Sequence, residues 1–128
     1  MESTYKVSDN ALNDFVAECA EIIQRVTEQL GKLESGNGSP EVIDDLYRSI
    51  HTLKGSSQLF GFKDLGDLAH ALETSLDPLR KGAQVLVPGL TEVIYQCLDL
   101  IEKIVRSIQS REPLDYNPQL EILIPALI

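Results

Sequence analysis

The sequence predicts an all-α fold, an up-down antiparallel four-helix bundle with a short additional C-terminal helix docked on it. Apolar residues recur at spacings of three and four along the chain, and no stretch alternates apolar and polar residues as a half-buried strand would. Turn-forming segments divide this pattern into four long helices and one short one. Amphipathic helices with short connections bury their apolar faces most simply as an antiparallel bundle. The length of 128 residues suits one domain, residues 1–128.

The first predicted helix runs over about residues 8–33. Ser8 or Asp9 can cap its N-terminus, because side-chain oxygens at that position accept hydrogen bonds from the free amides of the first turn. One face of this helix is apolar along its whole length. That face consists of Leu12, Phe15, Val16, Cys19, Ile22, Ile23, Val26, Leu30 and Leu33.

The second predicted helix covers about residues 40–60, after the turn segment ESGNGSP. Ser39 directly before Pro40 is typical of a helix start, because the fixed φ of proline suits the first turn. Gly61 is the expected C-terminal cap residue. The apolar face contains Ile43, Leu46, Ile50, Leu53, Ser57 and Phe60.

The third predicted helix covers about residues 64–81, with Asp64 as its N-cap and Gly82 at its end. We expect Pro78 to kink or loosen the last turn, because proline removes one backbone donor. The apolar face contains Leu65, Leu68, Leu72, Leu76 and Leu79.

The fourth predicted helix covers about residues 88–110, and Pro113 then breaks the chain. A short tail helix is predicted over about 118–127. Its apolar sequence would be a poor free end, so we expect it to dock on the bundle. The apolar face of the fourth helix contains Leu90, Val93, Ile94, Cys97, Leu100, Ile101, Ile104, Val105 and Ile108.

Composition excludes several kinds of partner. Twenty acidic and eleven basic side chains give a net charge of −9, which repels a phosphate backbone and argues against nucleic acid. No apolar run reaches the roughly 18 residues that a membrane span needs, and the polar opening MESTYKVSDN predicts no signal peptide. Cys19 and Cys97 form no CxxC pair and read as small buried residues in a reducing compartment. We therefore expect a cytoplasmic protein that does not bind membranes.

One of the two histidines is placed where packing does not explain it. At about 100° per residue, His51 lies roughly 130° from the centre of the apolar face of the second helix. On the third helix, His70 and Glu73 are both off the apolar face, and their i, i+3 spacing makes them neighbours. The segment GFK joins the two helices as a hairpin. Antiparallel packing can therefore bring Glu73 and His70 alongside His51, with Glu73 nearer to the helix interface.

The neighbours of His51 indicate phosphoryl chemistry. Gly55 costs about 1 kcal/mol against alanine inside a helix, and it clears space at i+4 from His51. Arg48 and Lys54 add positive charge one turn to each side, as a phosphoryl group requires. A neutral imidazole is a nucleophile through the nitrogen that lacks a proton. A carboxylate accepting from Nδ1–H leaves the Nε2 lone pair free, and Glu73 is the candidate.

A metal site is the first alternative, because two histidines and a glutamate on facing helices are a legitimate zinc or iron ligand set. Lys54 and Arg48 would then put positive charge beside the cation. Bundle metal sites also usually recruit carboxylates from several helices. We therefore predict no metal site.

The runs HTLKGSSQLFGF and LGDLAHALETSLDPLRKG resemble the histidine-containing phosphotransfer (HPt) domains, above all the N-terminal phosphotransfer domain of chemotaxis-type histidine kinases. In that family the phosphorylated histidine is followed by lysine at +3, glycine at +4, histidine at +19 and glutamate at +22. This sequence has His51, Lys54, Gly55, His70 and Glu73 at those positions. An interaction module whose histidine is no longer phosphorylated is the second alternative, and the intact set of positions argues against it.

The resemblance implies that His51 accepts a phosphoryl group from the ATP-binding domain of a histidine kinase and passes it to an aspartate of a response-regulator receiver domain. The chain has no glycine-rich phosphate loop of its own, so ATP and Mg²⁺ would be used by the partner domains and no cofactor is expected here. The chain could be the phosphotransfer domain of a larger kinase or a free-standing shuttle. We expect Glu73 to orient the imidazole and Lys54 and His70 to support the site. The residues expected to bind the partner are Arg48, Gly55 and Gln58.

Overall fold

The computed structural model describes residues 8–36, 38–82 and 85–128. Within them the chain forms helices and no strands, which confirms the all-α prediction. The helices are α1 (Asp9–Glu34), α2 (Pro40–Leu59), α3 (Lys63–Arg80), α4 (Pro88–Ser110) and α5 (Asn117–Leu127). Each of them begins and ends within one residue of its predicted bounds. Residues 1–7, which make up most of the segment behind the signal-peptide prediction, lie outside the described residues.

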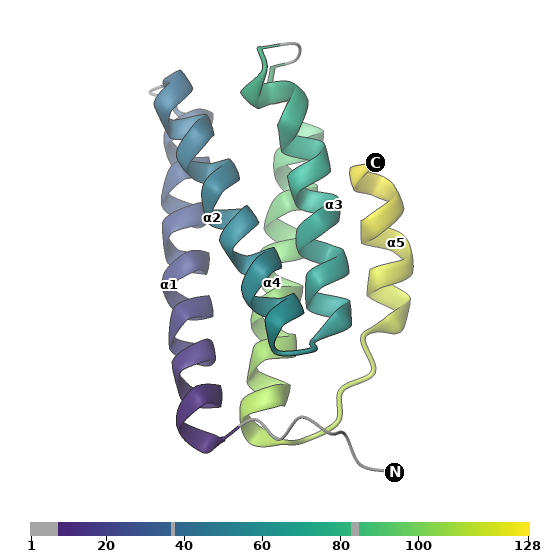
Figure 1. The fold of residues 1–128 in the computed structure, drawn as a ribbon. Helices are drawn as coiled ribbons and strands as arrows, with labels where there is room; N and C mark the ends of the chain where they lie inside the picture. Colours follow the sequence, from purple (N-terminus) through teal and green to yellow (C-terminus); the bar gives the residue numbers. More distant parts are fainter. Residues whose placement is uncertain (1–7, 37, 83–84) are drawn as a thin grey trace.

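Helices α1 to α4 run alternately up and down, and α5 packs on the outside of the bundle against α3 and α4 (Figure 1). The predicted docking of the tail is confirmed, because α5 buries Leu120, Leu123 and Leu127 against the bundle. Cys19 and Cys97 are free thiols in the core. Burial raises the pKa of both thiols to about 12, so they behave as small apolar residues.

Two of the predicted helix starts have the expected side-chain caps. The hydroxyl of Ser8 accepts a hydrogen bond from the amide of Ala11 at 3.1 Å, at the start of α1. The hydroxyl of Ser39 accepts from the amide of Val42 at 3.4 Å, directly before Pro40 and α2. These bonds satisfy amides that the first turn of a helix leaves free.

The start of α3 differs from the prediction. The helix begins at Lys63, preceded by Phe62 with no side-chain cap, so Asp64 lies inside the first turn instead of capping it. The cause is the tight turn before it. Gly61 has a φ of 77°, and the amide of Phe62 donates to the carbonyl of Ser57 at 2.9 Å. This turn reverses the chain early. The negative charge of the Asp64 carboxylate instead lies in the first turn, where it interacts favourably with the positive end of the helix dipole.

The last turn of α3 continues through Pro78 to Arg80. Proline removes the bond to the carbonyl of Thr74, four residues earlier. Helical hydrogen bonding resumes after Pro78, because the amide of Lys81 donates to the carbonyl of Asp77 at 3.0 Å. Gly82, with a φ of 76°, follows the helix as predicted.

The hairpin of α2 and α3 is the most extensive helix pair, and it positions the site. Gly66 allows the close approach, since a Cβ atom there would lie 3.3 Å from Cγ of Gln58. Near the turn, the ring of Phe15 from α1 packs against Phe60 and Phe62, with centroids 4.9 and 5.1 Å apart. The hairpin is therefore anchored to α1 as well as to itself.

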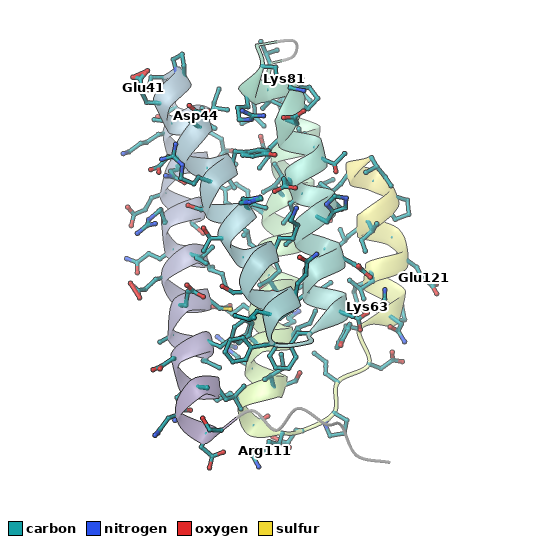
Figure 2. All side chains as sticks on the ribbon, viewed as in Figure 1. Glu41, Asp44, Lys63, Lys81, Arg111 and Glu121 are labelled. Carbon is teal, nitrogen blue, oxygen red and sulfur yellow. The ribbon has the colours of Figure 1, made fainter. Side chains whose placement is uncertain are left out.

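The outer faces of the helices are polar and charged. Figure 2 shows charged side chains spread around the bundle, and those of Glu41, Lys63 and Glu121 are exposed. In the part of the chain that the structure describes, no helix combines the length and the apolar character needed to cross a bilayer.

Candidate functional site

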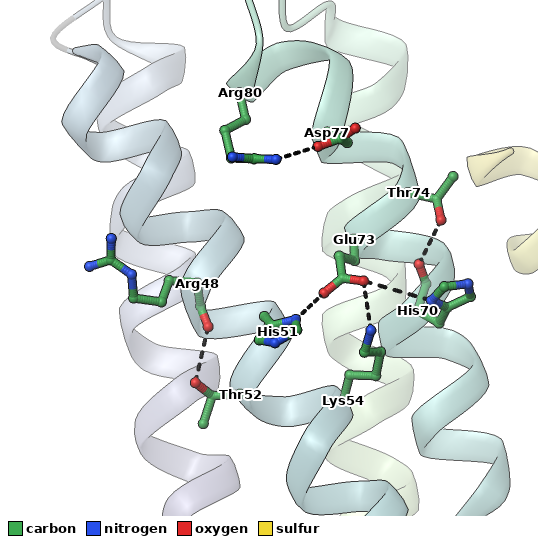
Figure 3. A network of polar contacts seen from close by, with 9 residues as sticks. All are labelled: Arg48, His51, Thr52, Lys54, His70, Glu73, Thr74, Asp77 and Arg80. Atoms are coloured by element: carbon green, nitrogen blue, oxygen red, sulfur yellow. Dashed lines mark hydrogen bonds and ion pairs between the residues drawn. The ribbon is translucent and has the colours of Figure 1, made fainter.

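The imidazole of His51 projects from α2 at the interface with α3, and 62% of its side chain is exposed (Figure 3). Its Nδ1 atom is hydrogen bonded to Oε2 of Glu73. An ionised carboxylate only accepts hydrogen bonds, so Nδ1 carries the proton. When the ring is neutral, the lone pair is then on Nε2, the nitrogen on the other side of the ring.

Glu73 differs from the prediction in its burial. It was predicted to lie off the apolar face of its helix, but its side chain is only 9% exposed because α2 covers it. Burial raises the pKa of this carboxyl, yet hydrogen bonds from Lys54 and His51 together outweigh burial and hold its pKa below the ordinary value. Glu73 is therefore a carboxylate at neutral pH, and both of its oxygens are directed at side chains of α2.

Lys54 is one turn after His51 and points at the same carboxylate. Its Nζ atom donates to Oε1 of Glu73 at 2.8 Å, and its side chain is 19% exposed. The charge of Lys54 was predicted to serve an incoming phosphoryl group. The structure instead directs its ammonium at Glu73, where it fixes the carboxylate that holds His51.

His70 is more loosely attached to this network. Its Nδ1 atom lies 3.7 Å from Oε1 of Glu73, beyond hydrogen-bond distance, and 65% of its side chain is exposed. The predicted neighbours are therefore all brought together, with Glu73 at the centre and His70 at the edge (Figure 3).

The residues predicted to bind a partner, Arg48, Gly55 and Gln58, are all exposed on α2. A Cβ atom at Gly55 would meet nothing within 4 Å, so packing within this chain does not require a glycine there. The missing side chain instead leaves a bare patch of surface one turn from His51. This surface is accessible to a second molecule.

Two further residues near His51, Tyr47 and Arg80, were not predicted to have a role in the site. The ring of Tyr47 is stacked on the imidazole, with centroids 6.4 Å apart and an interplanar angle of 8°. The guanidinium carbon of Arg80 lies 4.4 Å from the centre of the Tyr47 ring. Helical spacing could have found Tyr47, because it is four residues before His51 on the same helix. Arg80 comes from α3, and only the packing of the hairpin brings it there.

These side chains border an open hollow of about 330 Å³ beside the imidazole. It is lined by Asp44, Tyr47, Arg48, His51 and Arg80.

A metal site would need a different arrangement. Among residues 8–36, 38–82 and 85–128, no group of three or more histidine, cysteine, aspartate and glutamate side chains converges to hold an ion. The ammonium of Lys54 donates to Oε1 of Glu73, the carboxylate oxygen that His51 does not contact. A cation bound to this carboxylate would lie beside that positive charge.

Comparison with known proteins identifies the family. The sequence model of the Hpt domain matches residues 10–108. The chemotaxis protein CheA of Listeria monocytogenes is 32% identical over 103 residues, which cover 80% of this chain and 17% of that protein. The chain thus corresponds to about a sixth of the length of this relative.

Two solved structures share the fold. The CheA phosphotransferase domain from Thermotoga maritima is 31% identical with a TM-score of 0.75, covering 80% of this chain and 98% of that one. The phosphorylated P1 domain of CheA3 from R. sphaeroides, solved in complex with CheY6, is 20% identical with a TM-score of 0.83, covering 94% of each chain. Since the family match spans most of the bundle and includes His51 and Glu73, the chain belongs to the Hpt domain family.

Proposed function

We propose that the chain is a phosphocarrier in two-component signalling. His51 accepts a phosphoryl group from the ATP-binding domain of a histidine kinase and passes it to an aspartate of a receiver domain. One observation carries the proposal. An exposed imidazole has Nδ1 held by a buried, ionised carboxylate, which leaves Nε2 as the nucleophile.

The chemistry follows from this geometry. The Nε2 lone pair of His51 forms a bond to the γ-phosphorus of ATP, while the bond from that phosphorus to the bridging oxygen breaks and ADP leaves with the electron pair. Positive charge then develops on the ring, and the hydrogen bond from Nδ1–H to Glu73 stabilises it. In the second step a carboxylate oxygen of the receiver forms the new bond to phosphorus, and Nε2 recovers its lone pair.

The surface around His51 suits the approach of two successive partners. Transfer requires the reacting atoms to come within about 3–3.5 Å, so a partner must contact the helix surface around the imidazole. Gly55 and Gln58 offer an exposed surface there, and Arg48 adds a positive charge. A receiver partner is supported by the P1 domain of CheA3, which was solved phosphorylated and in complex with CheY6.

The donor and the compartment are also part of the proposal. The match to a small fraction of CheA supports a chain that works with an ATP-binding domain, either in the same protein or in a separate kinase. ATP and Mg²⁺ are then used by that domain. The two free, buried cysteines suit the reducing cytoplasm.

The test uses a histidine-kinase domain and radiolabelled ATP. We expect acid-labile label on the wild-type chain, none on His51→Gln, and label that still forms on His70→Gln, the matched variant that loses the other imidazole but keeps the nucleophile. The circular dichroism spectrum should be unchanged in both variants, because both imidazoles are largely exposed. Label that persists in His51→Gln would assign the chemistry to another residue. A wild-type chain that binds the kinase but takes no label would favour the interaction module.

A further inference from the structure

The hollow beside His51 has two arginines on its rim, and they come from different helices. Arg48 belongs to α2 and Arg80 to the last turn of α3, and both line the hollow together with the imidazole. Arg80 lies one helix away from His51 in sequence, so only the packing of the hairpin makes them neighbours. Figure 3 shows Arg80 above the imidazole in that view and Arg48 to one side.

Contacts on two sides hold the guanidinium of Arg80 in place. Its Nη2 atom donates to Oδ1 of Asp77 at 2.7 Å, and its guanidinium carbon lies over the Tyr47 ring, 4.4 Å from the ring centroid. Asp77 also pairs with Lys81, whose Nζ lies 2.8 Å from Oδ2. One carboxylate is thus shared by two cations, and the cluster keeps a positive charge. Guanidinium has five N–H donors, so several of them stay available to an anion.

This local charge is opposite to that of the whole chain. The net charge of −9 repels an approaching phosphate, so a phosphate would need a cationic site near the reacting atom. Arg48 and Arg80 supply such a site. Asp44 lines the same hollow, and its negative charge partly offsets that of the two arginines. Removing the charge of Asp44 should therefore strengthen the binding of an anion, whereas removing an arginine should weaken it.

We propose that this hollow is an anion subsite in which Arg80 and Arg48 bind the phosphate oxygens of the phosphoryl donor and aim its phosphorus at Nε2 of His51. The inference rests on the proposed function and assigns a binding role to Arg80. The ligand class is a phosphate ester, anhydride or amide, whose oxygens match the planar donors of arginine. Tyr47 positions Arg80 by providing the ring on which its guanidinium stacks.

Phosphoramidate tests the subsite without a kinase. It is a small anionic donor that reacts in its N-protonated form: the P–N bond breaks as the Nε2 lone pair bonds to phosphorus, and ammonia leaves with the electron pair and the three protons of its nitrogen. The Nδ1 proton remains hydrogen bonded to Glu73 and is later released to water. The rate of phosphohistidine formation is measured by mass spectrometry as a function of phosphoramidate and salt concentration, and is corrected for the neutral fraction of His51 in each variant.

Arg80→Gln should lower the rate at low donor concentration by about tenfold, the size of a lost charge-assisted contact. The half-saturating donor concentration should rise, the rate at saturation should change little, and the salt dependence should weaken. Asp44→Asn should raise the rate at low donor concentration. The matched control is Arg106→Gln on α4, which makes the same change of charge away from the hollow and should react like the wild type.

A neutral electrophile separates anion binding from an effect on the ring itself. Diethyl pyrocarbonate also modifies imidazole nitrogen, so His51 in Arg80→Gln should react with it at the wild-type rate. Equal slowing with both reagents would mean that Arg80 acts through Tyr47 and the imidazole, which overturns the subsite. Wild-type rates with phosphoramidate in Arg80→Gln and Asp44→Asn would also overturn it.

The failure of the subsite can be distinguished from the failure of the proposed function. If the wild-type chain is labelled by kinase and ATP but not by phosphoramidate, the proposed function is upheld and the subsite is overturned. If neither donor labels the chain, both the proposed function and the subsite are overturned.

Discussion

Glu73 on α3 accepts a hydrogen bond from Nδ1 of His51 on α2, across an interface that joins residues 22 positions apart in sequence. The contact makes the orientation of the imidazole depend on the packing of the hairpin. Since the carboxylate is buried and the imidazole is largely exposed, the buried partner orients the exposed one.

Glu73→Ala should slow phosphorylation of His51 by about 10- to 100-fold without abolishing it, because the nucleophile remains while its tautomer and orientation are no longer held. Nitrogen-15 NMR should show a larger share of the tautomer with the proton on Nε2. His70→Ala is the control and should have a smaller effect, since its Nδ1 lies 3.7 Å from the carboxylate. An unchanged rate and tautomer in Glu73→Ala would pass the orienting role to another group.

Lys54 should act through Glu73 and not independently of it. Lys54→Met removes the 2.8 Å contact to Oε1, so phosphorylation should slow. Once Glu73→Gln is present, the same lysine substitution should have little further effect, and the two changes should be strongly non-additive. Lys63→Met is the control, because Lys63 pairs with Asp67 on the exposed side of α3. Additive effects on the rate would instead indicate direct contact of Lys54 with the phosphoryl group.

Two substitutions at Gly55 test the stability of the helix and the access of a partner to its surface independently. Gly55→Ala should stabilise the fold by about 1 kcal/mol, measured by urea denaturation, because its Cβ would meet nothing within 4 Å. Gly55→Arg should keep the fold but slow transfer to a receiver about tenfold or more, since a clash of about 1.4 kcal/mol already has that effect. Gly31 on α1 is equally unobstructed, and Gly31→Arg is the matched control. Normal transfer in Gly55→Arg would place the partner elsewhere.

The pKa of Glu73 predicts an acid-sensitive contribution to stability. Its pKa in the folded chain is below the ordinary value of 4.5, so the ionised carboxylate stabilises the fold above that pH. The contribution is lost as the pH falls through the folded pKa. The free energy of unfolding of the wild type should therefore fall toward that of Glu73→Gln as the pH is lowered below 4.5. A constant difference across this range would mean that Glu73 has the same pKa in both states.

The helices and their order could be predicted from the sequence, because they depend on local properties. Apolar residues at a spacing of three and four determine which face of each helix is buried. Ser8 and Ser39 mark helix starts through their side-chain caps, and Gly82 marks a helix end through its positive φ. The exception is Asp64. A capping preference of one residue was overridden by the Gly61 turn and the Phe62 amide, which are set by how α2 ends.

The candidate site was predicted in part for the same reason. His51 stands off the apolar face of its own helix, and this periodicity alone indicated exposure. The periodicity of a single helix does not determine how that helix packs against another. The burial of Glu73, the turn of Lys54 toward it and the approach of Arg80 to Tyr47 depend on the separation and rotation of α2 and α3. Those are decided by side-chain packing along the whole interface, including the close approach at Gly66, and packing energies are summed over many small contacts that periodicity does not record.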